Sequence, residues 1–200
     1  MLCIRGAGLR ALALSLAPLL TSLTLLTACA TSPRALADRA YTGRFAVTTA
    51  SAEQRESVSG RFGLEIRGLQ QILELSSPLG TTVARIEIEP GGARATGAQM
   101  QEVRGADADA LTEKLLGWPL PVSGLADWIE GRPVPSRPAH VEREGGRIVL
   151  LEQDGWTIRL PEYFEGNGAT ARPRRLVLER PTRANTPSVV LRLIVDEPAV

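Results

Sequence analysis

Cysteine and histidine are almost missing from this chain of 200 residues, and their scarcity excludes several kinds of site. The two cysteines, Cys3 and Cys29, both lie in the N-terminal part, so the rest of the chain contains no thiol. The single histidine, His140, follows Pro138 and Ala139, and one histidine cannot form a metal cluster by itself. We therefore predict no disulfide, no metal site and no cysteine nucleophile, and we assign His140 to a loop.

An excess of one charge is missing as well, since 23 Lys and Arg face 22 Asp and Glu. This balance gives no electrostatic reason to expect nucleic-acid binding. The chain also lacks a Gly-x-Ser-x-Gly elbow, a phosphate-binding glycine loop and a Ser-x-x-Lys pair. A pair of carboxylates for glycoside hydrolysis stays open, although most acidic residues alternate with Arg as on a solvated strand face. We predict a protein that is not an enzyme and needs no cofactor.

The N-terminal segment has the pattern of a bacterial signal peptide. Arg5 and Arg10 precede an uncharged, Leu-rich run that ends in small residues. Leu26-Thr27-Ala28-Cys29 is a lipobox, in which small residues let the peptidase approach and the cysteine thiol takes a diacylglycerol group. A membrane-spanning helix is the alternative, and Pro18 weakens it. We predict that residues 1–28 are removed and that Cys29 becomes the acylated N-terminus.

The residues after the cysteine indicate the destination. An Asp at this position typically retains a lipoprotein in the inner membrane, whereas Ala30 and Thr31 stand here. We therefore predict a protein anchored by its lipid to the outer membrane and facing the periplasm. Residues 29–40 form the acylated N-terminus and a short tether, and residues 41–200 form a single domain large enough for one core.

From Tyr41 onward, apolar and polar residues alternate with the period of β-strands. In residues 57–68, Phe62, Leu64 and Ile66 face one way while the charged residues between them face the other. Similar runs continue to the C-terminus with short connections, including an Asp154-Gly155 hairpin turn. About nine or ten strands of this kind predict a mainly β fold, an antiparallel barrel or a strongly curved sheet.

Two short helices are predicted in mid-chain. Asp107 can cap the first, which Gly117 ends, and Ser123 can cap the second, which Gly131 ends. Both have an apolar stripe, so they need a sheet face to cover. Large aromatic surface is scarce and comes mostly from Trp118, Trp128 and Trp156. These tryptophans either pack in the core or line a cavity for an apolar ligand, and both interpretations stay open.

The junction Ser77-Pro78-Leu79-Gly80 places a large apolar side chain in a tight turn. Pro78 cannot continue a strand ladder, and Gly80 lets the chain reverse. Such a turn directs the side chain of Leu79 outward, unless it folds back under the rim of the barrel. A single exposed leucine carries little information by itself.

Several short motifs occur in a fixed order along the mature chain. They are the lipobox, Gly43-Arg-Phe-Ala, Ser77-Pro-Leu-Gly-Thr, Leu116-Gly-Trp-Pro-Leu-Pro, Asp127-Trp-Ile-Glu-Gly and Gln153-Asp-Gly-Trp. In this order and spacing they resemble the outer-membrane lipoprotein receptor family LolB. The resemblance extends over nearly the whole mature chain.

This resemblance implies an incomplete antiparallel β-barrel whose helices cover an apolar cavity for acyl chains. It further implies that the protein is a monomer whose lipoprotein cargo comes from the soluble periplasmic carrier LolA, without nucleotide hydrolysis at the receptor. The Pro78-Leu79-Gly80 turn would be a membrane-insertion loop, as in the family. The residues expected to line the cavity are Phe62, Leu64, Ile66, Leu73, Leu75, Ile86, Ile88, Trp118, Trp128 and Trp156.

Another class of protein fits the same pattern. An outer-membrane lipoprotein with a structural or envelope-assembly role would have a solid core and no acyl-chain ligand. A soluble carrier of the LolA type would share the fold but would lack the lipobox.

Overall fold

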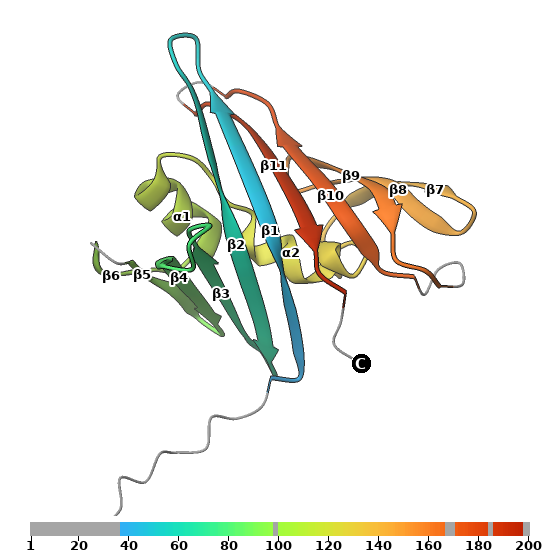
Figure 1. Cartoon of the computed structure of the whole chain (residues 1–200), viewed down its shortest axis with the longest axis horizontal. Helices are drawn as coiled ribbons and strands as arrows, with labels where there is room; N and C mark the ends of the chain where they lie inside the picture. The colour runs from blue at the N-terminus through green and yellow to red at the C-terminus, as the bar shows by residue number, and fades with distance from the viewer. Residues whose placement is uncertain (1–36, 98–99, 167–170, 184–185, 198–200) are drawn as a thin grey trace, which may run out of the picture. The chain divides into compact units, whose positions relative to one another are not determined.

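Antiparallel strands dominate the computed structural model, which describes residues 37–97, 100–166, 171–183 and 186–197 (Figure 1). The helices are α1 (Ala108–Leu116) and α2 (Val122–Ile129). The strands are β1 (Arg39–Ala50), β2 (Arg55–Arg67), β3 (Gln70–Ser76), β4 (Thr82–Glu89), β5 (Gly92–Gly97), β6 (Met100–Gly105), β7 (Ala139–Glu144), β8 (Arg147–Gln153), β9 (Trp156–Tyr163), β10 (Pro173–Arg180) and β11 (Ser188–Val195). The predicted mainly β fold is therefore confirmed.

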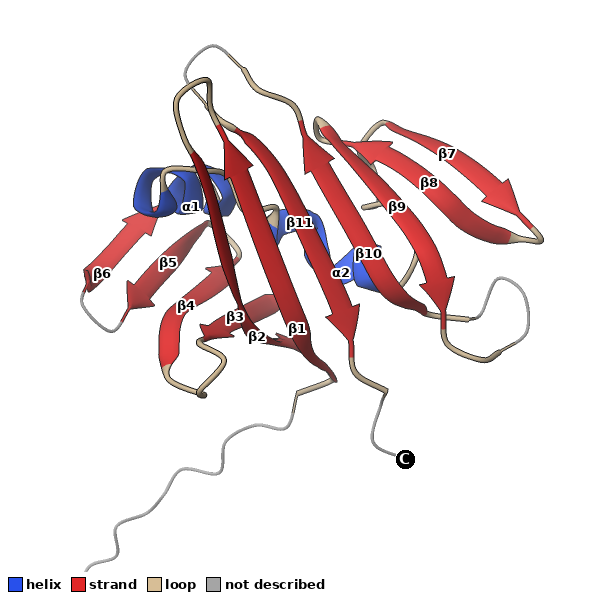
Figure 2. Ribbon diagram, turned by 45° about the horizontal axis from the view of Figure 1, so that its top comes forward, coloured by secondary structure: helices blue, strands red, loops and turns tan. Residues whose placement is uncertain are grey.

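One sheet contains all of these strands, in the order β6-β5-β4-β3-β2-β1-β11-β10-β9-β8-β7. The first and last strands, β1 and β11, pair with each other in the middle of the sheet. Within the described ranges β6 and β7 have one neighbour each, so the curved sheet of Figure 2 stays open between them. The chain segment that carries α1 and α2 joins these two edges, which gives the predicted incomplete barrel with helices over its opening.

The inner face of the sheet is apolar because its strands keep strict alternation. Leu64 pairs with Tyr41 on β1 and with Leu73 on β3, and Leu73 pairs with Ile86 on β4. All four side chains are buried, and together they form a continuous apolar row across four strands. Apolar side chains of both helices belong to the same core cluster, so the helices lie against this inner face (Figure 1).

A strand glycine makes room for one of the aromatic rings. A Cβ atom at Gly43 would lie 2.6 Å from the ring of Phe62 and 2.2 Å from the backbone oxygen of Ile194. The ring of Phe62 therefore lies across the backbone of β1, and no larger residue fits there. This contact gives a physical reason for the glycine of the Gly43-Arg-Phe-Ala motif.

Helix α1 has the predicted ends. The carboxylate of Asp107 accepts hydrogen bonds from the backbone N–H groups of Asp109 and Ala110, at 2.8 and 3.1 Å. At the other end Gly117 has a φ of 76° and donates its N–H to the carbonyl of Glu113. Both ends match the cap chemistry that favours Asp at the start of a helix and Gly at its end.

Helix α2 does not have the predicted cap. Pro121 precedes the helix, and Ser123 lies inside its first turn without capping it. The backbone N–H and the hydroxyl of Ser123 instead donate to the carboxylate of Asp109 on α1, at 3.0 and 2.9 Å. The serine therefore joins the two helices, and the expectation of a serine cap is wrong.

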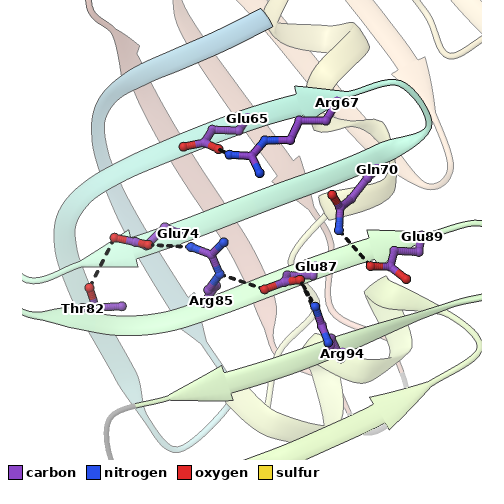
Figure 3. Close-up of polar contacts among 9 residues, drawn as sticks. All are labelled: Glu65, Arg67, Gln70, Glu74, Thr82, Arg85, Glu87, Glu89 and Arg94. Atoms are coloured by element: carbon purple, nitrogen blue, oxygen red, sulfur yellow. Dashed lines mark hydrogen bonds and ion pairs between the residues drawn. The ribbon is translucent and has the colours of Figure 1, made fainter. Parts of the chain in front are cut away.

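The outer face of β2 to β5 is covered by a network of paired charges (Figure 3). Arg85 donates to Glu74 and Glu87, and Arg94 donates to Glu87 from the next strand. Ile72 lies on this face between Glu65 and Glu87, yet it is only 4% exposed. Such shielding requires that the hydrocarbon stems of the charged side chains cover it.

Strand β7 was not expected from the sequence, and His140 lies in it rather than in a loop. The side chain of His140 is 62% exposed, and its Nε2 atom lies 3.5 Å from a carboxylate oxygen of Glu142. Strand β1 begins at Arg39, inside the residues predicted to form the tether. No helix within the described ranges is long and apolar enough to cross a membrane.

Candidate functional site

The interior between the sheet and the helices gathers the residues predicted to line a cavity. Most of them are between 1 and 4% exposed, whereas Leu75, Ile88 and Trp118 are half-buried against the same cluster. The buried members are Phe62, Leu64, Ile66, Leu73, Ile86, Trp128 and Trp156. The structure therefore brings all ten together on one apolar surface; their contact with acyl chains stays a prediction.

The other half of the barrel wall is equally apolar, and the predicted set includes only Trp156 from it. The buried inward side chains of β8 to β11 are at most 4% exposed. The signal for them was present in the sequence, because Arg147–Gln153 and Ser188–Val195 are short, largely apolar runs of strand length. The inward residues of this half include Leu151, Ile158, Leu176, Leu178, Leu191 and Leu193.

A buried glutamine fixes helix α2 to the wall. Gln153 is 3% exposed, and its amide oxygen accepts from the indole N–H of Trp128 and the backbone N–H of Val134, at 2.9 and 2.8 Å. Its amide nitrogen donates to the carbonyls of Val134 and Arg137. A buried amide with this full set of partners strongly specifies how the helix and the following segment pack on β8.

A cluster of charged and phenolic groups joins the end of α2 to the start of β1. The carboxylate of Glu130 accepts from the phenol of Tyr41 and from the guanidinium groups of Arg39 and Arg132. Burial alone would raise the pKa of Glu130, but these donors lower it below its usual range. Burial and the bond to Glu130 raise the pKa of Tyr41 to about 12. At neutral pH Glu130 is therefore an anion that holds α2 on the sheet.

Helix α1 is held more weakly. It buries Ala108, Leu111 and Thr112, whereas the shorter α2 buries six residues. Its carboxylate Asp109 faces Ser123 on α2, and burial raises the pKa of this carboxyl group. Helix α1 is therefore the least buried part of the structure that covers the interior.

A hollow of about 680 Å³ lies at the C-terminal end of α1, next to the β1–β2 loop and the segment between β10 and β11. Trp118 lies at the boundary between this hollow and the core cluster. About half of the lining surface is polar, so the hollow differs in character from the aliphatic interior. Residues around it include Glu53, Gln54, Glu56, Leu116, Trp118 and Thr186.

The turn between β3 and β4 projects Leu79 into solvent. The carbonyl of Ser77 accepts from the N–H of Gly80 at 2.9 Å, with Pro78 in the second position that this kind of turn favours. Gly80 has a φ of 88°, in the region that favours glycine. The side chain of Leu79 is 96% exposed and does not fold under the rim.

The remaining predicted site residue, Cys29, lies outside the described residues. Within the described ranges, no group of three or more His, Cys, Asp or Glu side chains could hold a metal ion.

Comparison with known proteins identifies the family of this chain. The family model described as outer membrane lipoprotein LolB matches residues 38–197. The chain belongs to the LolB family. The resemblance found in the order of its motifs is therefore confirmed.

Individual LolB proteins match over most of their length. An outer-membrane lipoprotein LolB of Cupriavidus pinatubonensis is 38% identical over 165 residues, 80% of this chain and 79% of that protein. The LolB of Bordetella petrii is 39% identical over 182 residues, 87% and 88% of the two chains. A crystal structure of a LolA superfamily protein from Nitrosomonas europaea aligns with 79% of this chain and 84% of that one, at 11% identity and a TM-score of 0.44.

LolB proteins are outer-membrane lipoproteins, in agreement with the location predicted from the lipobox and from Ala30. The LolB motifs now have identified positions in the fold. The Asp127-Trp-Ile-Glu-Gly motif contains both Trp128, which donates to Gln153, and Glu130, which binds Tyr41. This motif therefore supplies the two contacts that hold α2 over the interior.

Proposed function

We propose that this protein is a receptor in the outer membrane that accepts the acyl chains of lipoproteins and passes them to the inner leaflet. The observation that carries the proposal is the aliphatic inner face of an open sheet, covered by two short helices. Membership of the LolB family supports it. We further propose that the cargo arrives from a soluble periplasmic carrier of the LolA type and that the receptor acts as a monomer.

The energetics of this task require an apolar surface and no catalytic group. Moving an acyl chain into water costs ~0.8 kcal/mol per methylene, or roughly 10 kcal/mol or more for a whole chain. An interior of Leu, Ile and Val side chains offsets this loss by keeping the chain away from water. Transfer to the bilayer then proceeds without nucleotide hydrolysis if each successive site holds the chain more favourably than the last.

Acyl chains need space that side chains occupy in this conformation. Helix α1 can create the space by moving away from β5 and β6, because only three of its nine residues are buried. Helix α2 stays in place, fixed by Gln153 and by the Glu130 cluster. The side chains of Leu73, Ile86 and Leu111 would then contact the incoming chains.

Cys29 and the Leu79 turn are the two parts of the protein that would contact the membrane. Acylation of Cys29 would hold the domain at the outer membrane, with residues 1–28 removed and residues 29–40 as the tether. The exposed turn of Pro78, Leu79 and Gly80 would enter the lipid and let the cargo chains leave the interior for the bilayer.

The test is a two-step transfer with purified components. A LolA-type carrier loaded with one fluorescent lipoprotein is mixed with the acylated receptor, and vesicles of phosphatidylethanolamine and phosphatidylglycerol are added afterwards. We expect the cargo to move first to the receptor and then to the vesicles. A receptor that takes no cargo, and binds no fluorescent fatty acid that palmitate displaces, would instead be a structural or envelope-assembly lipoprotein.

A further inference from the structure

A second exposed leucine lies in a turn whose geometry does not require it. Gly68 and Leu69 form the two-residue loop between β2 and β3, and Arg67 pairs directly with Gln70. Gly68 has a φ of 57°, as the first position of such hairpin loops requires. The side chain of Leu69 is 80% exposed, so it adds almost nothing to the packing of the fold.

This turn is bonded to the place where the described chain begins. The carboxylate of Asp38 accepts from the N–H of Gly68 at 2.6 Å, and the N–H of Asp38 donates to the carbonyl of Ile66 at 2.8 Å. The described chain therefore begins beside the Gly68-Leu69 turn, and Asp38 follows Cys29 by nine residues. Nine residues extend over at most about 32 Å.

The opposite end of the barrel lies far from this point. Strand β1 runs for 12 residues from Arg39 to the β1–β2 loop. At about 3.3 Å per residue, that loop is roughly 40 Å from the start of the strand. A lipid anchor at Cys29 would hold the start of β1, and with it the Gly68-Leu69 turn, within about 32 Å of the bilayer, a shorter span than the length of β1.

The charged groups around the turn leave no excess of positive charge, because Asp38 and Glu89 add to the carboxylates that pair with arginines. Arg67 is paired with Glu65, Arg39 with Glu130, and Gln70 binds Glu89 on β4. A contact made by Leu69 is consequently apolar, with little dependence on salt.

We propose that Leu69 is a membrane-contact residue, which inserts into the same bilayer as the acyl anchor and orients the domain with its β2–β3 end on the lipid surface. This inference rests on the proposed anchor at Cys29. Strand β3 has seven residues, so the turns of Leu69 and Leu79 lie about 23 Å apart at its two ends.

The test places a fluorescent probe in the turn of the full-length, processed protein. Leu69→Cys is labelled with nitrobenzoxadiazole and reconstituted in vesicles of phosphatidylethanolamine and phosphatidylglycerol that contain brominated phospholipid. Val58→Cys is the matched control, because Val58 is also apolar, is 58% exposed and lies on β2 nearer the β1–β2 loop. The same dye at both sites removes the contribution of the dye's own affinity for lipid.

We expect the bromolipid to quench the probe at residue 69 strongly and the probe at residue 58 weakly, at both 0.05 and 0.5 M salt. Burial of a leucine side chain favours the inserted state by roughly tenfold or more, so most molecules should show the contact. Equal quenching at the two sites would contradict the membrane contact of Leu69. It would leave the proposed receptor function untouched, because cargo transfer is measured in a separate assay. Protein that does not float with the vesicles would contradict the proposed anchor at Cys29, and therefore also the membrane contact of Leu69.

Discussion

Replacing Leu79 by glutamate should separate folding from delivery. The side chain is 96% exposed, so the folded domain has almost no packing to lose, and surface changes of this kind usually stay within ~0.5 kcal/mol. A leucine buried under the rim would lose ~2–5 kcal/mol on truncation alone. We therefore expect an unchanged melting temperature in Leu79→Glu.

Delivery should fall by a much larger factor. Burying one leucine in lipid contributes ~1.5–3 kcal/mol, which corresponds to about 10- to 150-fold in an equilibrium. A glutamate at the same place opposes entry into lipid because its carboxylate must lose water. The variant should accept cargo from the carrier at the normal rate and deliver it to vesicles at least tenfold more slowly.

The assay measures both steps on the same sample, by recovering the receptor after the first step and floating the vesicles after the second. Val58→Glu is the control for a new carboxylate at an exposed apolar position outside the turn, on β2. Normal delivery by Leu79→Glu would refute the role of the turn. A melting temperature lowered by several degrees would show that the residue belongs to the core instead.

Three other changes test the anchor, the interior and the contact that holds α2. Cys29→Ala should leave a precursor with its signal attached, seen as a larger band without label from radioactive palmitate; cleavage after residue 28 in this variant would contradict the lipobox. Ile86→Glu places a carboxylate at a position that is only 2% exposed, so it should unfold the domain or abolish fatty-acid binding. Glu74 points outward, and Glu74→Gln should change neither the melting temperature nor the displacement of a bound fatty acid. Glu130→Gln should lower the free energy of unfolding at neutral pH. Because folding depresses the pKa of Glu130, the difference in free energy of unfolding between the variant and the parent protein should shrink as pH falls below about 4.5. A difference that does not change with pH would contradict the ionic contact.

The strands of the inner wall could be predicted because their two faces differ sharply. Ile86 and Ile88 are separated by Glu87, so only one strand orientation buries the apolar pair, and a shift by one residue would expose it. The ends of α1 were equally predictable, since Asp107 and Gly117 each satisfy backbone groups that every helix leaves open.

The elements that sequence reasoning missed depend on contacts with distant parts of the chain. Strand β7 is an edge strand in which only Val141 is partly covered, so it shows no alternation. Ser123 could serve either helix, and only the packing of α1 on α2 selects Asp109 as its partner. Gln153 looks like a surface residue in the sequence, because its partners lie 16 to 25 positions away.

The pairing of β1 with β11 has a consequence for biogenesis. Gly43 and Val195 lie side by side although more than 150 residues separate them, and the N–H of Asp196 donates to the carbonyl of Thr42. The central strand of the sheet therefore lacks one neighbour until the last strand has been synthesised and exported. Contacts this distant in sequence form late in folding. During that interval the unfinished edge of β1 is open to pairing with other chains, and a nascent chain cut short before Ser188 would never complete its apolar interior.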